Sequence, residues 1–323
     1  MPKQAVLLLA HGTPETIDQI PDYLRNVVSG RPMPRHVIEE IQHRYALIGR
    51  SPLTDLTMEH AQLVETELAA SGQPVKVYAG MRNWRPYIPD VVGQMRADGV
   101  EEAAVLCLAP QNSRTSVGLY ERAVRAEAGP IRIDFTRGWA GHPLLADAFA
   151  ERLRAAQQKV SAETGAPVPV LFTAHSVPTR TVEPPAVPDD GPRLWPGEGA
   201  DPYAEDARRT ATLVAERVPE VPRWDFAFQS QGASGGPPIK WTGPTVEETL
   251  DRMAAEGVTT VLLQPIGFLC DHVEILYDID IAFKQYAARI GIRLERPESL
   301  NNSPTLARAV ADLARRGLAR LQG

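Results

Sequence analysis

The sequence is poor in cysteine and has no long basic or apolar run. Its two cysteines, Cys107 and Cys270, cannot ligate a four-thiolate iron–sulfur cluster, and their scarcity suits a reducing cytosol. A net charge of −6 without a basic run argues against nucleic acid as a partner. No stretch approaches the roughly 18 apolar residues of a membrane span. The apolar run Ala5–Ala10 is too short for a signal peptide and lacks a small-residue cleavage site. We therefore expect a soluble, cytoplasmic protein with no integral membrane association.

Several motifs of common enzyme classes are also missing. There is no G-x-S-x-G elbow, and neither cysteine has activating neighbours in the sequence, so nucleophilic hydrolysis is disfavoured. The glycine-rich stretch Gly232–Gly236 matches neither a Walker A loop nor a dinucleotide fingerprint. No closely spaced set of cysteines and histidines indicates a closed structural zinc site.

A repeated motif stands out in what is present. Val6–Pro14 reads VLLLAHGTP and Val170–Pro178 reads VLFTAHSVP, so each half of the chain has an apolar run that ends in Ala-His and a turn. The two histidines are His11 and His175. The repeat predicts two similar halves, each presenting an imidazole where a buried strand ends.

Apolar runs alternate with amphipathic stretches along the whole chain. The runs show no period-two alternation, which is typical of strands covered on both faces, and strand–helix alternation predicts βαβ units with parallel sheets. The strands are expected at 5–9, 75–79, 103–108, 132–135, 168–173, 224–228, 259–263 and 292–294.

The fold class is therefore α/β, with two doubly wound, Rossmann-like lobes. We expect an N-terminal lobe over residues 1–140 and a C-terminal lobe over 141–323. A capping box at Thr245–Glu248 opens one helix. Ser303-Pro304 opens the last helix, which is expected over 303–321. Packing of this helix back on the first lobe is an alternative to packing within the second. The segment Val182–Gly199, rich in proline, glycine and acids, is expected to be a surface loop or insertion.

Polar and glycine-rich residues cluster just after the predicted strands. In an open parallel sheet these positions share the carboxyl edge, where ligands bind. Turn chemistry alone accounts for any one such loop, but five together favour a site in a cleft between the lobes. They are 11–13, 110–113, 175–176, 229–232 and 265–272.

The stretch Pro265–Phe283 carries three carboxylates, Asp271, Glu274 and Asp278, at positions i, i+3 and i+7. On an α-helix this spacing stacks them along one face. A solvated acidic face is the simpler interpretation, but the interleaved apolar residues predict partial burial. Partly buried carboxylates beside an imidazole such as His175 suit a labile divalent-cation site or a proton relay.

Five motifs together resemble the ferrochelatase family over nearly the whole chain, in order. They are RY-x-x-IG…SPL (44–53), LAP-x-x-S-x-x-SV-x-x-Y (108–120), AHSVP (174–178), QSQG…W-x-GP (229–244) and P-x-GF-x-x-DH-x-E-x-LYD-x-D (265–280). The likeness is greatest to the soluble, monoderm-type coproporphyrin III ferrochelatases. The sequence lacks the apolar lip and C-terminal cluster cysteines of animal-type protoporphyrin enzymes.

The resemblance implies a chelatase-like fold with its active cleft between the lobes. It also implies a lyase of haem and porphyrin biosynthesis that inserts ferrous iron into coproporphyrin III, forming coproheme with loss of two pyrrole protons. His175 and Glu274 would form the iron site, with Asp278 next to them. Whether His175 accepts protons or ligates metal stays open. Iron would be a substrate, with no tightly bound cofactor or iron–sulfur cluster, and a transient contact with the downstream coproheme-processing enzyme is a further expectation.

The same resemblance implies contacts to the porphyrin and its propionates. An arginine suits a carboxylate through its bidentate fork. The candidates are His11, Arg31, Arg44, Tyr45, Ser51 and Tyr120.

The chain departs from the family pattern at several positions. His11 stands where related coproporphyrin enzymes often have a tyrosine that can meet the iron of the product. Val28 stands where a basic residue is sometimes found, which weakens the expected propionate contacts. Asn83 and Ala282 replace outer metal-binding side chains, so a secondary metal site is not expected.

Three alternatives stay open from the sequence. A protoporphyrin IX ferrochelatase would use the same iron site. A cobalt- or nickel-inserting sirohydrochlorin chelatase would share the LLLAHGT opening but leave the DH-x-E-x-LYD block unexplained. A bilobed protein that carries haem or a solute without chemistry is the non-enzyme hypothesis.

Overall fold

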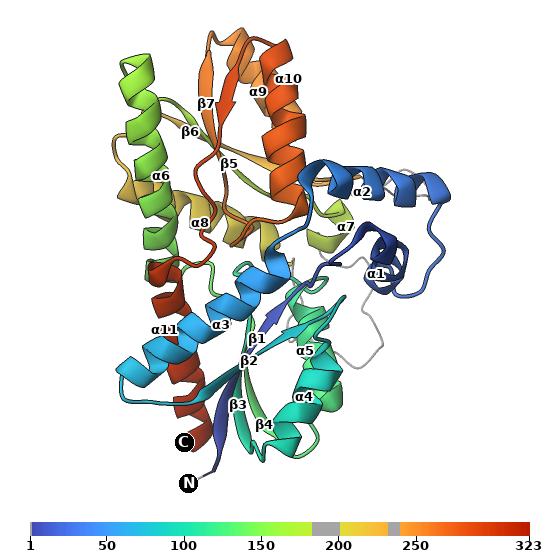
Figure 1. Ribbon diagram of the computed structural model, residues 1–323. Helices are drawn as coiled ribbons and strands as arrows, with labels where there is room; N and C mark the ends of the chain where they lie inside the picture. The colour runs from blue at the N-terminus through green and yellow to red at the C-terminus, as the bar shows by residue number, and fades with distance from the viewer. Residues whose placement is uncertain (1, 183–200, 232–239) are drawn as a thin grey trace.

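The computed structural model describes residues 2–182, 201–231 and 240–323. Within these ranges the chain forms two parallel four-stranded sheets, one above the other in Figure 1. The predicted α/β class with two doubly wound lobes is confirmed. Most of Val182–Gly199 and all of Gly232–Gly236 lie outside the described residues, so the expectations for these two segments stay predictions.

The first sheet has the strand order β2-β1-β3-β4. Its strands and the helices around them are β1 (Gln4–Ala10), the short 3-10 helix η1 (Ile17–Gln19), α1 (Ile20–Val27), α2 (Arg35–Ile48), α3 (Leu53–Ala70), β2 (Lys76–Met81), α4 (Ile88–Ala97), β3 (Glu102–Cys107), α5 (Val117–Glu127) and β4 (Arg132–Thr136).

The second sheet repeats this layout with the order β6-β5-β7-β8. Its elements are α6 (Pro143–Thr164), β5 (Val170–His175), α7 (Thr179–Val182), α8 (Tyr203–Arg217), β6 (Trp224–Gln229), α9 (Val246–Ala255), β7 (Thr260–Pro265), the π-helix η2 (Glu274–Phe283), α10 (Lys284–Arg289), β8 (Arg293–Glu295) and α11 (Pro304–Gln322).

Every predicted strand is present, with ends that shift by a few residues. The central strands β1 and β5 are buried along almost their whole length, as their unalternating apolar sequences predict. Both strands have a parallel neighbour on each side. β1 ends at Ala10, directly before His11, and β5 ends at His175, so the repeated motif places one imidazole at the carboxyl edge of each sheet.

The hydrophobic core has three main parts, one of which spans both lobes. The shared part packs β1, β3 and β5 against α3, α6, α8 and α11. The outer face of the first sheet packs against α4 and α5, and that of the second against α9, η2 and α10. A core continuous across the lobes fixes the relative position of the two carboxyl edges.

The last helix, α11, begins at Pro304, and the hydroxyl of the preceding Ser303 caps it by accepting from the backbone N–H of Leu306. The helix contacts β3, β4 and α3 of the first sheet as well as α6 (Figure 1). At Gly317 a Cβ atom would approach Ala104 Cβ to 2.9 Å, so the helix lies directly on β3. A domain boundary near residue 140 remains a prediction.

Candidate active site

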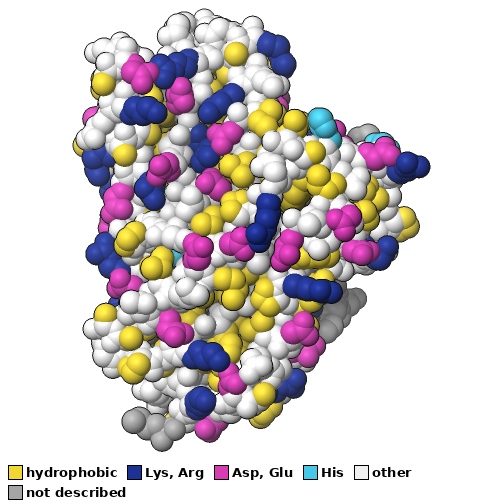
Figure 2. All heavy atoms as spheres, viewed as in Figure 1, with side chains coloured by type: hydrophobic (Ala, Val, Ile, Leu, Met, Phe, Trp, Pro, Cys, Tyr) yellow, Lys and Arg dark blue, Asp and Glu magenta, His cyan; other side chains and the backbone are white. Residues whose placement is uncertain are grey.

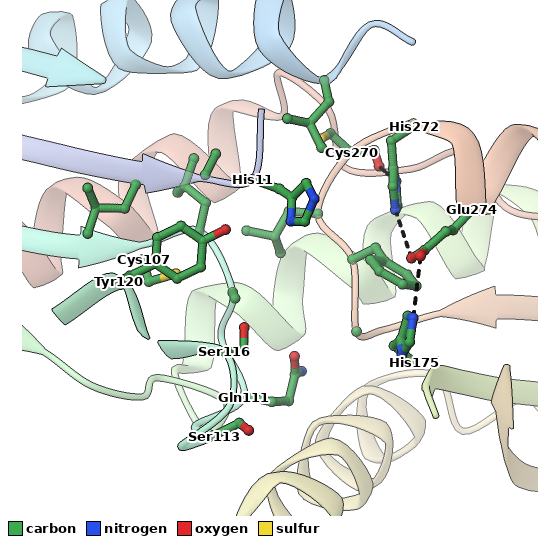
Figure 3. Close-up of a pocket in the computed structure, with 18 of the residues that line it drawn as sticks. His11, Cys107, Gln111, Ser113, Ser116, Tyr120, His175, Cys270, His272 and Glu274 are labelled. Carbon is green, nitrogen blue, oxygen red and sulfur yellow. Dashed lines mark hydrogen bonds and ion pairs between the residues drawn. The ribbon is translucent and has the colours of Figure 1, made fainter. Parts of the chain in front are cut away.

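A cavity of about 470 Å³ lies between the carboxyl edges of the two sheets. This volume falls within the range of sites for small molecules and cofactors, roughly 300–1,000 Å³. Its wall includes His11 and Tyr120 from the first lobe and His175, His272 and Glu274 from the second. Figure 3 shows His11 on one side of the space and the His175–Glu274–His272 group on the other.

His175 lies at the end of β5, where its ring is held on both sides. Nδ1 contacts the carbonyl oxygen of Ser176, which makes Nδ1 the protonated donor. Nε2 then faces Glu274, with 3.3 Å between Nε2 and Oε1. The phenol of Tyr203 donates to the backbone oxygen of His175 at 2.9 Å. The imidazole is therefore oriented with Nε2 toward the cavity.

Glu274 is the first residue of the π-helix η2 and lies between two imidazoles. Besides His175, the Nε2 atom of His272 lies 3.5 Å from Oε2 of Glu274 (Figure 3). Burial would raise the pKa of the Glu274 carboxyl, but His175 and His272 hold that pKa well below its usual value. The group is therefore a carboxylate at every physiological pH.

The charge of Glu274 acts back on His175. Burial alone would lower the pKa of the His175 imidazole, but the adjacent carboxylate raises that pKa to about 9. His175 and Glu274 therefore form an imidazolium–carboxylate ion pair at neutral pH.

The loop between β7 and η2 brings Glu274 to His175. At Gly267 a Cβ atom would approach both Cα and Cβ of Ala174 to 3.0 Å, so a side chain there would push the loop away from β5. The side chain of Gln229 links β5 to the start of η2. It accepts from Thr173 Oγ1 at 2.5 Å and donates to the backbone oxygen of Glu274 at 3.4 Å. This gives a positional reason for glutamine at the start of the QSQG stretch.

The pKa of His11 is shifted in the opposite direction to that of His175. Burial and the nearby Arg82 guanidinium lower the pKa of His11 to about 4, so the ring is neutral at physiological pH. It lies edge-on to Tyr23, with 5.9 Å between ring centroids, and near the Asn83 amide. The turn after it requires Gly12 (φ +78°), where a Cβ would meet Met81 Cβ at 2.8 Å.

The prediction that Asp271, Glu274 and Asp278 stack along one face of an α-helix is wrong. Asp271 precedes the helix, and its carboxylate accepts from Ser299 at 2.6 Å and Asn301 at 3.0 Å and pairs with Arg296. The helix itself has π rather than α geometry, so α-helical spacing does not apply. Asp278 does lie on η2 and is only 6% exposed, which excludes a solvated acidic face.

The structure brings together only some of the predicted site residues. His11, Tyr120, His175 and Glu274 line the cavity, and the Tyr120 ring lies 5.3 Å from the Arg82 guanidinium. Asp278 lies behind this wall and pairs with Arg44. Three candidates are placed elsewhere: Arg31 is exposed and bonded to the Val28 carbonyl, while Tyr45 and Ser51 are buried outside the cavity wall.

Four further side chains that were not predicted from the sequence line the cavity: Tyr23, His60, Tyr203 and His272. His272 lies inside the DH-x-E block, so its motif was a usable signal. The imidazole of His60 is buried without a hydrogen-bond partner among the described residues, and burial lowers its pKa to about 4. No pattern in the sequence marks Tyr23, His60 or Tyr203.

Two cysteines, Cys107 and Cys270, line the cavity. Burial raises the pKa of both Cys107 and Cys270 to about 12. Neither is therefore an activated nucleophile. Within residues 2–182, 201–231 and 240–323, no group of three or more His, Cys, Asp or Glu side chains is arranged to hold a metal ion, and no helix is long and apolar enough to cross a membrane. Figure 2 shows acidic and basic side chains interspersed over the visible face.

These features define a two-lobed α/β protein with an imidazole–carboxylate pair in the cavity between its two sheets. The chain belongs to the ferrochelatase family, whose model matches residues 3–318. It is a lyase that inserts iron into a porphyrin in haem biosynthesis. The sirohydrochlorin and binding-protein hypotheses are thereby set aside.

Individual relatives agree with this assignment. The chain is 58% identical over 321 residues to a ferrochelatase of Acidobacterium capsulatum, covering 99% of this chain and 96% of the relative. It is 34% identical over 319 residues to a coproporphyrin III ferrochelatase of Mycolicibacterium vanbaalenii, covering 97% and 89%. The solved structure of SirB from Bacillus subtilis with Fe3+ matches with a TM-score of 0.58 at 15% identity, covering 99% of this chain and 98% of that one, and supports the fold alone.

Proposed function

We propose that the porphyrin is coproporphyrin III and that the product is coproheme. Two observations support this choice of ring: the motifs resemble the coproporphyrin enzymes, and the Mycolicibacterium vanbaalenii relative carries that name. Protoporphyrin IX is the second candidate, because the 58% identical relative is named ferrochelatase without a stated porphyrin.

The observation that carries the proposed iron site is the His175–Glu274 pair facing His11 across one cavity. A porphyrin between them would present one face to each lobe. Glu274 offers an oxygen and His175 a nitrogen to an arriving ferrous ion, and the porphyrin nitrogens then take over its coordination. His11 offers a neutral lone pair from the opposite face, available without loss of a proton.

The pair gives His175 two successive roles. Ferrous iron replaces the proton on Nε2, since metal and proton compete for the same lone pair. When the iron passes to the porphyrin, Nε2 becomes a free base and accepts one of the two pyrrole protons, which restores the imidazolium. The second proton leaves to solvent. In this proposal His175 is a metal ligand first and a proton acceptor afterwards.

Absorption spectroscopy tests this site. Purified protein with coproporphyrin III and ferrous iron should develop the bands of the metalloporphyrin. Either His175→Ala or Glu274→Ala should reduce the rate by at least about a hundredfold, because each removes a group that handles both metal and proton. Metal insertion at the parent rate by either variant would show that the site has been misassigned.

A further inference from the structure

The loop that follows β3 in the first lobe is bound to the second lobe by four consecutive residues, beginning with Gln111. The Gln111 side chain donates to the backbone oxygen of Ile266 at 3.1 Å and to the Thr210 hydroxyl at 3.3 Å. The backbone N–H of Asn112 donates to the Asp206 carboxylate at 2.9 Å. Ile266 follows β7, and the other two partners lie on α8. The loop is therefore a direct link between the two sides of the cleft.

Asp201 accepts the remaining bonds of this loop. It lies two residues before α8, and its side chain is 0% exposed. Its Oδ2 atom accepts from the backbone N–H of Arg114 at 2.7 Å and from the Ser113 hydroxyl at 3.3 Å, with Arg114 Nε at 3.6 Å. Its Oδ1 atom accepts from the backbone N–H of Tyr203 at 3.1 Å. One buried carboxylate thus joins the first-lobe loop to the first residue of α8.

Both ends of this connection reach the cavity. Ser113 lines it together with Thr115 and Ser116, and Figure 3 shows Ser113 and Ser116 on the side away from Glu274. At the other end, the Tyr203 hydroxyl donates to the backbone oxygen of His175 at 2.9 Å. Asp201 itself lies outside the cavity wall that the described residues form. It therefore acts on the cleft only through the residues it binds.

A carboxylate suits this position because it offers acceptors on both sides. Arg114 and Tyr203 each present a backbone N–H, one to each oxygen of Asp201. An asparagine has the same shape but only one acceptor oxygen, so one of these two N–H groups would face an NH2 donor whichever way the amide turned. A buried donor left without an acceptor costs free energy or moves away.

We propose that Asp201 is a positioning residue of the porphyrin site: it fixes the wall formed by residues 113–116 relative to α8 and His175, so that the ring fits between them. A wall displaced by about 1 Å is enough to weaken a site that works by orientation. This inference rests on the proposed binding of the porphyrin in this cavity.

The affinities for porphyrin and for metal separate this role from others. Asp201→Asn should raise the porphyrin KM about tenfold, because the wall that faces the ring is no longer held. Zinc affinity without porphyrin, measured by calorimetry, should stay within about twofold, because His175 and Glu274 keep their contacts with each other. If Asp201→Asn does not fold, Arg114→Ala removes a partner from the other side. It should raise the porphyrin KM about threefold, since its backbone N–H bond to Asp201 remains.

Glu102→Gln is the matched control. Glu102 begins β3, at the end of the strand away from the cleft, and its side chain is 1% exposed. Its carboxylate pairs with Arg132 and accepts from Gln4 Nε2 at 2.7 Å. Glu102→Gln should lower the free energy of unfolding in urea and leave the porphyrin KM unchanged.

Three results would overturn the proposal. One is an unchanged porphyrin KM in folded Asp201→Asn or Arg114→Ala. Another is an equal rise of the porphyrin KM in Glu102→Gln, which would reduce the effect to a general loss of stability. The third is a fall in zinc affinity as large as the rise in porphyrin KM, which would mean that Asp201 acts on the metal site instead.

The test does not depend on the choice of ring, because KM can be measured with either porphyrin that the parent protein metallates. A parent protein that metallates neither porphyrin would refute the proposed function. Porphyrin affinity measured by fluorescence without metal would then decide the role of Asp201, with the same tenfold difference expected between the parent protein and Asp201→Asn and none for Glu102→Gln.

Discussion

Replacing Glu274 with glutamine isolates the electrostatic coupling at the centre of the site. Glutamine keeps the size and a hydrogen-bonding oxygen but removes the charge that raises the pKa of His175 from its ordinary 6.5 to about 9. Burial, which lowers the pKa of His175, then acts without the opposing effect of the Glu274 charge. We expect the pKa of His175 to fall below 6.5 in Glu274→Gln, so that the ring is neutral at pH 7.5.

The same change alters how stability depends on pH. A raised histidine pKa stabilises the folded state fully below pH 6.5, and this contribution is lost as pH rises through 9. From 6.5 to 9 it amounts to at most about 3 kcal/mol, reduced by solvent because the two side chains are 32% and 33% exposed. The parent protein should therefore lose more unfolding free energy over this range than Glu274→Gln does.

Two measurements check the coupling. Imidazole nitrogen NMR, assigned by comparison with His175→Ala, gives the pKa directly, and urea unfolding at several pH values gives the slope. Glu298→Gln is a suitable control, since that carboxylate is 79% exposed and paired with Arg152. An unchanged His175 pKa in Glu274→Gln would refute the ion-pair reasoning.

Other predictions address the same site and the fold. Zinc binding at pH 7.5 should release about one proton per ion, measured by calorimetry in buffers of different ionisation enthalpy, and His175→Ala should abolish this release. Arg82→Gln should raise the pKa of His11 above about 4 but keep it below 6.5, because burial is its main cause; an NMR titration that shows no change would contradict this. Thr245→Ala removes the capping box of α9 and should cost about 1 kcal/mol of unfolding free energy in urea, while Thr212→Ala, on the exposed face of α8, should cost less.

The sheets could be predicted because their strands have a local signature. Runs such as 5–9 and 168–173 are apolar on both faces, and only a covered parallel strand buries such a run. The alternation with helices then predicts the topology. Caps at Thr245 and Ser303 are equally local, since each depends on a side chain and a backbone N–H three residues later.

What could not be predicted depends on contacts between distant residues. The π geometry of η2 leaves no mark in the residue spacing, so Asp271 was expected on the helix although it is bound to Ser299 and Asn301. Arg44 meets Asp278 only because α2 crosses to the second lobe. Tyr203 supports His175 from α8, outside any recognisable motif.

The choice of porphyrin is tested most directly by the ratio of kcat/KM for iron insertion into coproporphyrin III and protoporphyrin IX, measured side by side with the unmodified protein. The proposed function predicts a ratio well above one, by about tenfold or more, which corresponds to 1.4 kcal/mol of transition-state discrimination. A ratio at or below one would contradict coproporphyrin III as the substrate.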